Sequence, residues 1–110
     1  MNETMEGTLI DLIDRLSEVD QSDRYNPPCL YAAGGKFAKT SARARVCGGS
    51  DDDSRSCPED KALEYVLMVQ LAVQAISVWQ RWFGRVPNRI QKFQAVMYYA
   101  QNDAFFPREG

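Results

Sequence analysis

Apolar residues near the start of the chain recur three or four positions apart, which predicts an amphipathic helix over about residues 3–19. The apolar stripe consists of Met5, Leu9, Leu12, Ile13, Leu16 and Val19. Its opposite face carries Asp11, Asp14 and Glu18, so we expect an ordinary surface helix whose apolar side packs on a core.

A nearly continuous apolar stretch follows in the second half and predicts a long central helix over about residues 58–83, with Ser56 as its N-cap. The polar exceptions form one narrow seam: Gln70, Gln74, Ser77 and Arg81. A helix that is apolar on almost every side must be buried on almost every side. Two other helices can hardly provide this cover, so the pattern favours self-association or docking on a larger partner.

Gly84 has the character of a left-handed residue that ends this helix, and Pro87 opens another over about residues 87–102. The expected core stripe of the last helix is Ile90, Phe93, Met97 and Ala100. The apolar residues 104–107 are expected to fold back onto the body of the protein.

Residues 20–57 show no dominant pattern. The pair Gly34–Gly35 suits a β-hairpin turn, and residues 42–46 alternate with the period of a strand, although alanine and arginine also suit a helix. We therefore expect a mainly α fold in a single domain, residues 1–110. It is a small helical bundle with a long central helix, a helix-turn-helix-like C-terminal hairpin and an irregular loop, with or without a hairpin, at about 20–57.

Charge is divided into blocks, although the formal net charge is only −2. Residues 1–24 hold seven acids and two bases, whereas residues 25–50 hold four bases and no acid. Between Tyr65 and Asn102 there is no carboxylate, but there are four cations, six glutamines and seven aromatic residues. Such blocks either pair with each other on folding or leave a basic surface for an anionic partner.

The chain contains no histidine, so Ser-His-Asp and Cys-His catalytic sites are excluded. It also lacks the glycine-rich motifs that hold nucleotide phosphates. We therefore expect a protein that is not an enzyme and that has no cofactor and no small-molecule substrate.

Three cysteines, Cys29, Cys47 and Cys57, are widely spaced and form no CxxC pair, so no metal site is expected. Reduced, structural cysteines are the expected state in a reducing compartment, and a Cys29–Cys47 disulfide is the alternative in an exported protein.

The acidic start does not resemble a signal peptide, and the charge-free run over residues 65–80 is too short for a membrane span. These features predict a cytoplasmic or other intracellular location, in a phage or its host, and no membrane partner.

The candidate binding residues lie around Gly84. Residues 79–93 have the outline of a helix-turn-helix, whose second helix places base-reading side chains near its N-terminus. Gln80 and Arg85 stand where that motif usually has a small and an apolar residue. The candidate residues are Arg81, Trp82, Arg85, Asn88, Arg89, Gln91, Lys92 and Tyr99, with a second basic loop of Lys36, Lys39, Arg43 and Arg45.

Three interpretations of these residues stay open. They form a structural hairpin, they dock on a protein, or they bind duplex or single-stranded nucleic acid. Tryptophan, arginine and tyrosine are enriched at protein interface hot spots, and an acidic protein of this size is unusual for DNA binding. We therefore expect an accessory subunit or inhibitor that docks on a larger assembly, or a homo-oligomer. The alternative is a small nucleic-acid-binding regulator that uses Arg89 and Lys92.

Overall fold

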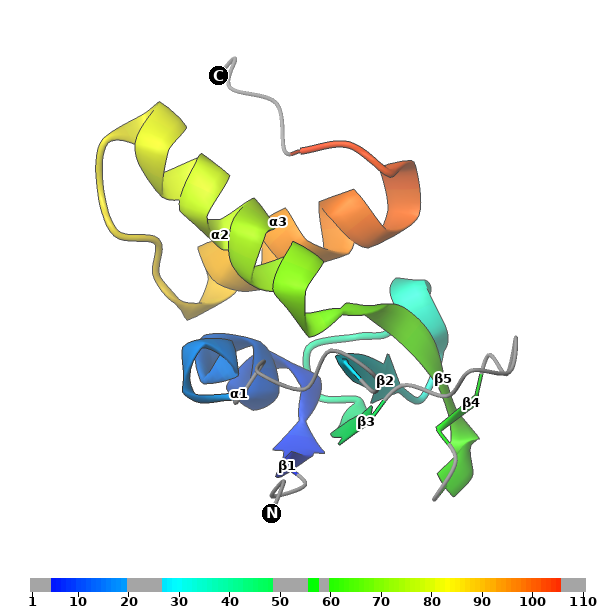
Figure 1. Ribbon diagram of the computed structural model, residues 1–110. Helices are drawn as coiled ribbons and strands as arrows, with labels where there is room; N and C mark the ends of the chain where they lie inside the picture. Colours follow the sequence, from blue (N-terminus) through cyan, green and yellow to red (C-terminus); the bar gives the residue numbers. More distant parts are fainter. Residues whose placement is uncertain (1–4, 20–26, 49–55, 58–59, 106–110) are drawn as a thin grey trace.

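Both strands and helices occur along the chain in a computed structural model that describes residues 5–19, 27–48, 56–57 and 60–105 (Figure 1). The strands are β1 Met5–Thr8, β2 Pro28–Ala32, β3 Arg43–Gly48, β4 Ser56–Cys57 and β5 Asp60–Met68. The helices are α1 Leu9–Asp14, α2 Val69–Phe83 and α3 Arg89–Asn102, with short 3-10 turns η1 Leu16–Glu18 and η2 Gly35–Phe37. Within the described residues the strands form one antiparallel sheet in the order β1-β3-β2-β5-β4. The fold is α+β, so the prediction of a mainly α helical bundle is wrong.

All three α-helices lie on one face of the sheet (Figure 1). The core between them contains apolar side chains from every layer. Its largest fully buried side chains are Leu9, Leu12, Ile13, Leu16, Leu30, Val69 and Val96. Full burial of such a side chain stabilises the fold by about 1.5–3 kcal/mol. This core fixes the positions of α1 and α3 relative to each other.

A smaller buried cluster lies on the other face of the sheet and contains Cys29, Tyr31, Cys47 and Leu63. The Tyr31 ring meets Tyr65 edge-on, with ring centroids 6.0 Å apart. Burial raises the pKa of Tyr31 to about 12. Cys47 is disulfide-bonded and Cys29 is a free, buried thiol. The expectation of fully reduced cysteines is therefore wrong, and Cys29 and Cys47 are not bonded to each other in this structure.

The predicted helix over residues 3–19 is interrupted. Residues 5–8 instead form β1, because they pair with β3 and place Glu6 opposite Arg45. Only Leu9–Asp14 is α-helical, and a 3-10 turn follows. The helical spacing still identified the buried side chains Leu9 and Leu12 correctly.

The predicted long helix over residues 58–83 is wrong in its first part. Asp60–Met68 form strand β5, which continues directly into α2 at Met68, as Figure 1 shows. Ser56 lies in β4 and is not an N-cap, whereas Pro58 lies outside the described residues. A strand with buried residues on both faces has a continuous apolar sequence, which periodicity cannot distinguish from a buried helix.

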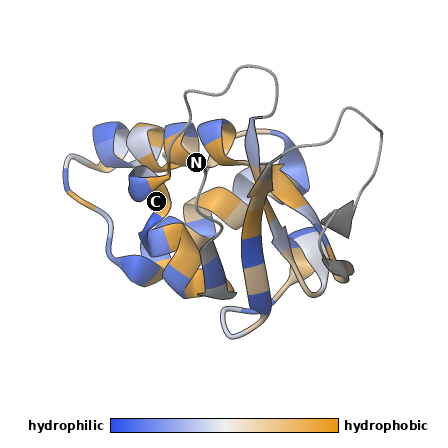
Figure 2. Ribbon diagram, turned by 60° about the horizontal axis from the view of Figure 1, so that its bottom comes forward, coloured by the Kyte–Doolittle hydropathy of each residue, from blue (hydrophilic) through white to orange (hydrophobic). Residues whose placement is uncertain are grey.

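The shorter α2 is amphipathic. Ala72, Ala75, Val78 and Trp79 are buried, while the polar seam of Gln70, Gln74, Ser77 and Arg81 is exposed. Figure 2 shows hydrophilic and hydrophobic residues alternating along the helices. One copy of the chain therefore buries the apolar side of this helix, and α2 needs no second copy to cover it.

The segment 20–57 contains a β-hairpin, because β2 and β3 pair antiparallel. Its returning strand begins only at Arg43, however, and Lys36 and Phe37 lie in the 3-10 turn η2 and not in a strand directly after Gly34–Gly35. Gly34 and Gly35 both have positive φ angles, 100° and 60°, in the connection between these strands. Residues 20–26 and 49–55 of the predicted loop lie outside the described residues.

The C-terminal hairpin also agrees with the prediction. Gly84 caps α2 with a φ of 69° in the left-handed region, and its N–H donates to the Gln80 carbonyl at 2.9 Å. The next helix begins at Arg89, two residues after Pro87. In the described part of the chain, no helix has the length and apolar character needed to cross a membrane.

Candidate functional site

An aromatic pair lies in the last turn of α2, just before the connection to α3. Trp79 is only 4% exposed, and its ring lies 4.5 Å from that of Phe83. The Arg85 guanidinium lies over the outer side of the Trp79 ring, 5.7 Å from its centroid. Such a cation–π contact contributes about 0.5–1 kcal/mol at an exposed site. The contact orients Arg85 but leaves the N–H groups at the edge of its guanidinium free of the stack.

Two of the predicted base-reading side chains are used inside the protein. The Gln91 N–H donates to Asn88 Oδ1 at 2.8 Å, and the Asn88 N–H donates to Gln91 Oε1 at 2.9 Å. This reciprocal pair is a capping box that satisfies orphan N–H groups at the start of α3. Asn88 and Gln91 therefore begin a helix, and their acceptor oxygens are occupied.

The two predicted cations of α3 face the acidic side of α1. Lys92 Nζ donates to Asp14 Oδ1 at 3.0 Å, and Arg89 forms an ion pair with Asp11. Arg89 Nε also lies 3.8 Å from Asp14 Oδ2. Lys92 further donates to the Asp14 main-chain carbonyl at 3.4 Å. Part of the acidic N-terminal block thus neutralises part of the C-terminal basic block.

The end of α2 carries two cations that differ from this pair. Within residues 5–19, 27–48, 56–57 and 60–105, no carboxylate pairs with Arg81 or Arg85. Both line a shallow hollow of about 570 Å³, together with Ser77, Gln80, Gly84 and Val86. Val86 is 72% exposed. An uncovered aliphatic side chain beside two arginines is therefore open to solvent.

Trp82 follows Arg81 on the helix and is 37% exposed. Part of its ring packs against Phe105, with centroids 6.4 Å apart, and Phe105 also contacts Tyr99 at 5.1 Å. Phe105 thus folds back as predicted, while residues 106–107 of the tail lie outside the described part. We call Arg81, Trp82, Arg85 and Val86 the docking corner.

The predicted second basic loop is not one surface. Lys36 lies in η2, where its carbonyl accepts from Gln101 Nε2 at 2.8 Å, and Lys39 is exposed in the following connection. Arg43 and Arg45 belong to β3, and Arg45 forms a 3.5 Å ion pair with Glu6. The structure therefore distributes these four cations over three separate elements.

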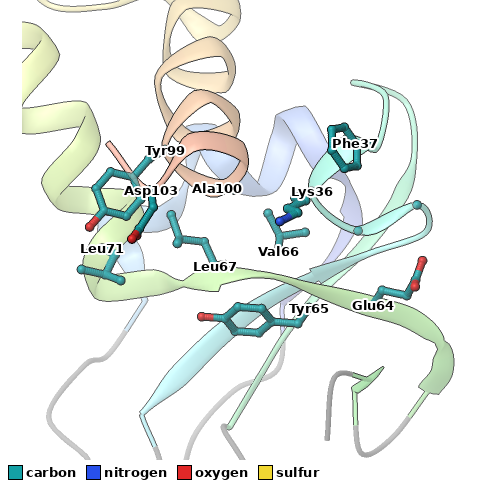
Figure 3. Close-up of a pocket in the computed structure, with 12 residues that line it drawn as sticks. Lys36, Phe37, Glu64, Tyr65, Val66, Leu67, Leu71, Tyr99, Ala100 and Asp103 are labelled. Carbon is teal, nitrogen blue, oxygen red and sulfur yellow. The ribbon is translucent and has the colours of Figure 1, made fainter. Parts of the chain in front are cut away.

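A second hollow, of about 680 Å³, lies between η2, β5 and α3 (Figure 3). Its lining includes one cation, Lys36, and two carboxylates, Glu64 and Asp103. Figure 3 shows Leu67 pointing toward α3 while Tyr65 lies on the opposite side of the strand. These mixed charges do not converge on one point, so the hollow indicates no particular ligand.

Two exposed apolar residues near the corner were not predicted. Val86 was not singled out in the sequence, and Ile90 was expected in the core stripe of the last helix but is 50% exposed. The helical spacing placed Ile90 on the same stripe as the buried Met97. Position 90 falls in the first turn of α3, whereas the buried residues of this helix, Ala95, Val96 and Met97, lie near its middle.

Comparison of the chain with known protein families, with curated proteins and with solved structures gives no significant match.

Proposed function

We propose that the protein is a non-enzymatic binding protein that docks on an acidic, partly apolar surface of a larger protein through the docking corner. The observation that carries this proposal is the pair Arg81 and Arg85, which flank the exposed Val86 around one hollow. In the described residues neither arginine has a carboxylate partner. A partner carboxylate with an adjacent apolar side chain complements both features.

The chemistry of the corner suits a protein hot spot. Arginine and tryptophan are among the residues that contribute most at protein interfaces, and the guanidinium binds carboxylates through two parallel hydrogen bonds. Arg85 is held over Trp79, so less conformational freedom is lost when it binds. Trp82, the residue after Arg81 in α2, is 37% exposed and adds apolar area at this end of the helix.

Base reading has less support from the contacts of α3. Asn88 and Gln91 are used in the capping box, and Arg89 and Lys92 face Asp11 and Asp14. A duplex would have to displace carboxylates from the side of α3 that it needs. Neither Arg81 nor Arg85 takes part in the capping box or in the ion pairs with α1.

Peptide display on the immobilised protein tests the proposal. Random 12-residue peptides are selected, and the dissociation constant of the strongest binder is measured by fluorescence polarisation. We expect selected peptides to carry Asp or Glu beside a large apolar residue. The double variant Arg81→Ala with Arg85→Ala should bind the peptide at least about tenfold more weakly, which is a loss of about 1.4 kcal/mol or more.

The matched control is Lys36→Ala with Lys39→Ala, which removes the same charge from exposed residues outside the corner. It should change the dissociation constant by less than about threefold. Equal weakening by both double variants would mean a general charge effect and would contradict the proposal. Binding to duplex or single-stranded DNA that falls steeply with salt would instead favour the nucleic-acid alternative.

A further inference from the structure

Two cysteines lie opposite each other on adjacent strands of the sheet, and they differ in covalent state. Cys29 of β2 stands directly opposite Cys47 of β3, and both side chains are buried, at 6% and 3% exposure. They belong to the same small cluster on the sheet face away from the helices. Cys29 is a free thiol, while Cys47 is disulfide-bonded. A nucleophile and a disulfide sulfur are thus placed on neighbouring strands.

The strand register places these residues at a distance that suits a disulfide. The Ala33 N–H donates to the Arg43 carbonyl at 2.9 Å, one step beyond the Ala32↔Ala44 pair. Hydrogen-bonded pairs alternate along an antiparallel ladder, so Cys29 and Cys47 form a pair of the same kind. The Cα atoms of such pairs are about 5.5 Å apart. Disulfides accept Cα separations of about 4.4–6.8 Å, so the register brings the two cysteines within the Cα range of a disulfide.

The surroundings of Cys29 have opposite effects on the pKa of its thiol. Burial raises its pKa, and a side-chain hydrogen bond with Tyr31 lowers it. The thiol also donates weakly to the Pro27 carbonyl, with the sulfur 3.6 Å from the oxygen. Tyr31 is itself kept neutral by burial, because its pKa is raised to about 12. Its hydroxyl therefore remains a donor toward sulfur under alkaline conditions that ionise a thiol.

We propose that Cys29 is an internal exchange thiol that moves the disulfide of Cys47 onto itself. Cys29 loses its proton, and its sulfur attacks the Cys47 sulfur. A Cys29–Cys47 bond forms, and the present disulfide of Cys47 breaks. The electron pair of the broken bond goes to the departing sulfur, which takes up a proton in place of the one that Cys29 released. One disulfide and one thiol are present before and after, so no oxidant or reductant is needed.

This exchange gives the protein two covalent isomers. In one, the free thiol lies buried in β2; in the other, β2 and β3 are cross-linked and the free thiol belongs to the former partner of Cys47. The position at which the protein reacts with an oxidant or another thiol therefore changes without any change in its overall redox state. This inference is independent of the docking corner.

Disulfide mapping tests the exchange, because trypsin cleavage at lysine and arginine places the cysteines on three peptides, 25–36, 46–55 and 56–61. The full chain is incubated without reductant at pH 8.5, blocked with N-ethylmaleimide at successive times and digested unreduced. We expect linked 25–36 and 46–55 to increase to a constant fraction, at a rate independent of protein concentration. If the linked peptides 25–36 and 46–55 do not increase at any time, the proposal is overturned.

Two variants make the test specific. Cys29→Ser should keep a single disulfide pattern at all times, because the attacking sulfur is missing. Tyr31→Phe, which keeps the ring, should slow the exchange by about two- to tenfold without changing the two isomers, because one hydrogen bond to sulfur is lost. An unchanged rate in a Tyr31→Phe protein with a native circular dichroism spectrum would overturn the role of Tyr31 as the positioning residue.

Discussion

Four cations lie within twelve positions of one another, yet they fall into two groups. Arg89 and Lys92 on α3 contact Asp11 and Asp14 of α1. Arg81 and Arg85 at the end of α2 have no carboxylate partner within the described residues. The two groups share residue type and sequence neighbourhood, so the element packed against each of them decides its role.

The position of α1 is the cause of this difference. Its apolar side chains are buried against the sheet and α3, which leaves its acidic face beside the first turns of α3. Lys92 and Asp14 are 78 positions apart in the sequence, so no local pattern reveals their contact. A basic segment is therefore a candidate binding surface only where the fold leaves its charges without intramolecular partners.

Trp79→Ala should lower the unfolding free energy most, because Trp79 is buried and its ring packs against Phe83 at the end of α2. We expect a loss of about 3–5 kcal/mol of unfolding free energy in urea denaturation. The matched variant Trp82→Ala should cost less than about 1 kcal/mol, since Trp82 is 37% exposed. Similar losses in both variants would show that the exposed tryptophan is part of the core.

Asp14→Ala should have an intermediate effect, because Asp14 accepts from Lys92 and lies near Arg89. We expect a loss of about 1 kcal/mol, since the pairs are partly exposed to solvent. Arg81→Ala should change the unfolding free energy by less than about 0.5 kcal/mol. A double-mutant cycle between Asp14 and Lys92 measures their coupling, and a coupling of zero would remove the distinction between the two groups of cations.

A change in salt concentration should have the smallest effect on the unfolding free energy. Between about 0.05 M and 0.5 M sodium chloride, screening weakens the ion pairs of Arg89 and Lys92. The stabilisation that Asp14 provides, measured as the difference in unfolding free energy between wild type and Asp14→Ala, should fall by a few tenths of a kcal/mol. The corresponding difference for Arg81→Ala should stay constant with salt. A salt-dependent Arg81 difference would indicate an intramolecular partner for that residue.

Part of the C-terminal half of the fold could be predicted from the sequence. Gly84 marked the end of α2, and Asn88 through Gln91 began a helix close to the predicted position. These signals are local, because a left-handed cap and a capping box depend on residues within one turn. Gly34 and Gly35 also marked a change of direction after β2, although the returning strand begins only at Arg43.

The remaining elements depend on contacts between distant segments. Residues 60–68 form a strand because β2 pairs with them, and residues 5–8 form one because β3 does. Their sequences are equally compatible with a helix, so propensity alone could not decide. The sequence placed the candidate site around Gly84, but which of its cations remain accessible depends on contacts with α1.

The dissociation constant of one acidic, apolar peptide for two double variants tests the central claim most directly. Arg81→Ala with Arg85→Ala and Arg89→Ala with Lys92→Ala remove the same charge from neighbouring positions. We predict that the first pair weakens binding at least about tenfold and that the second, confirmed as folded, weakens it less than about threefold. Weakening by the second pair that equals or exceeds that by the first would contradict the assignment of the docking corner.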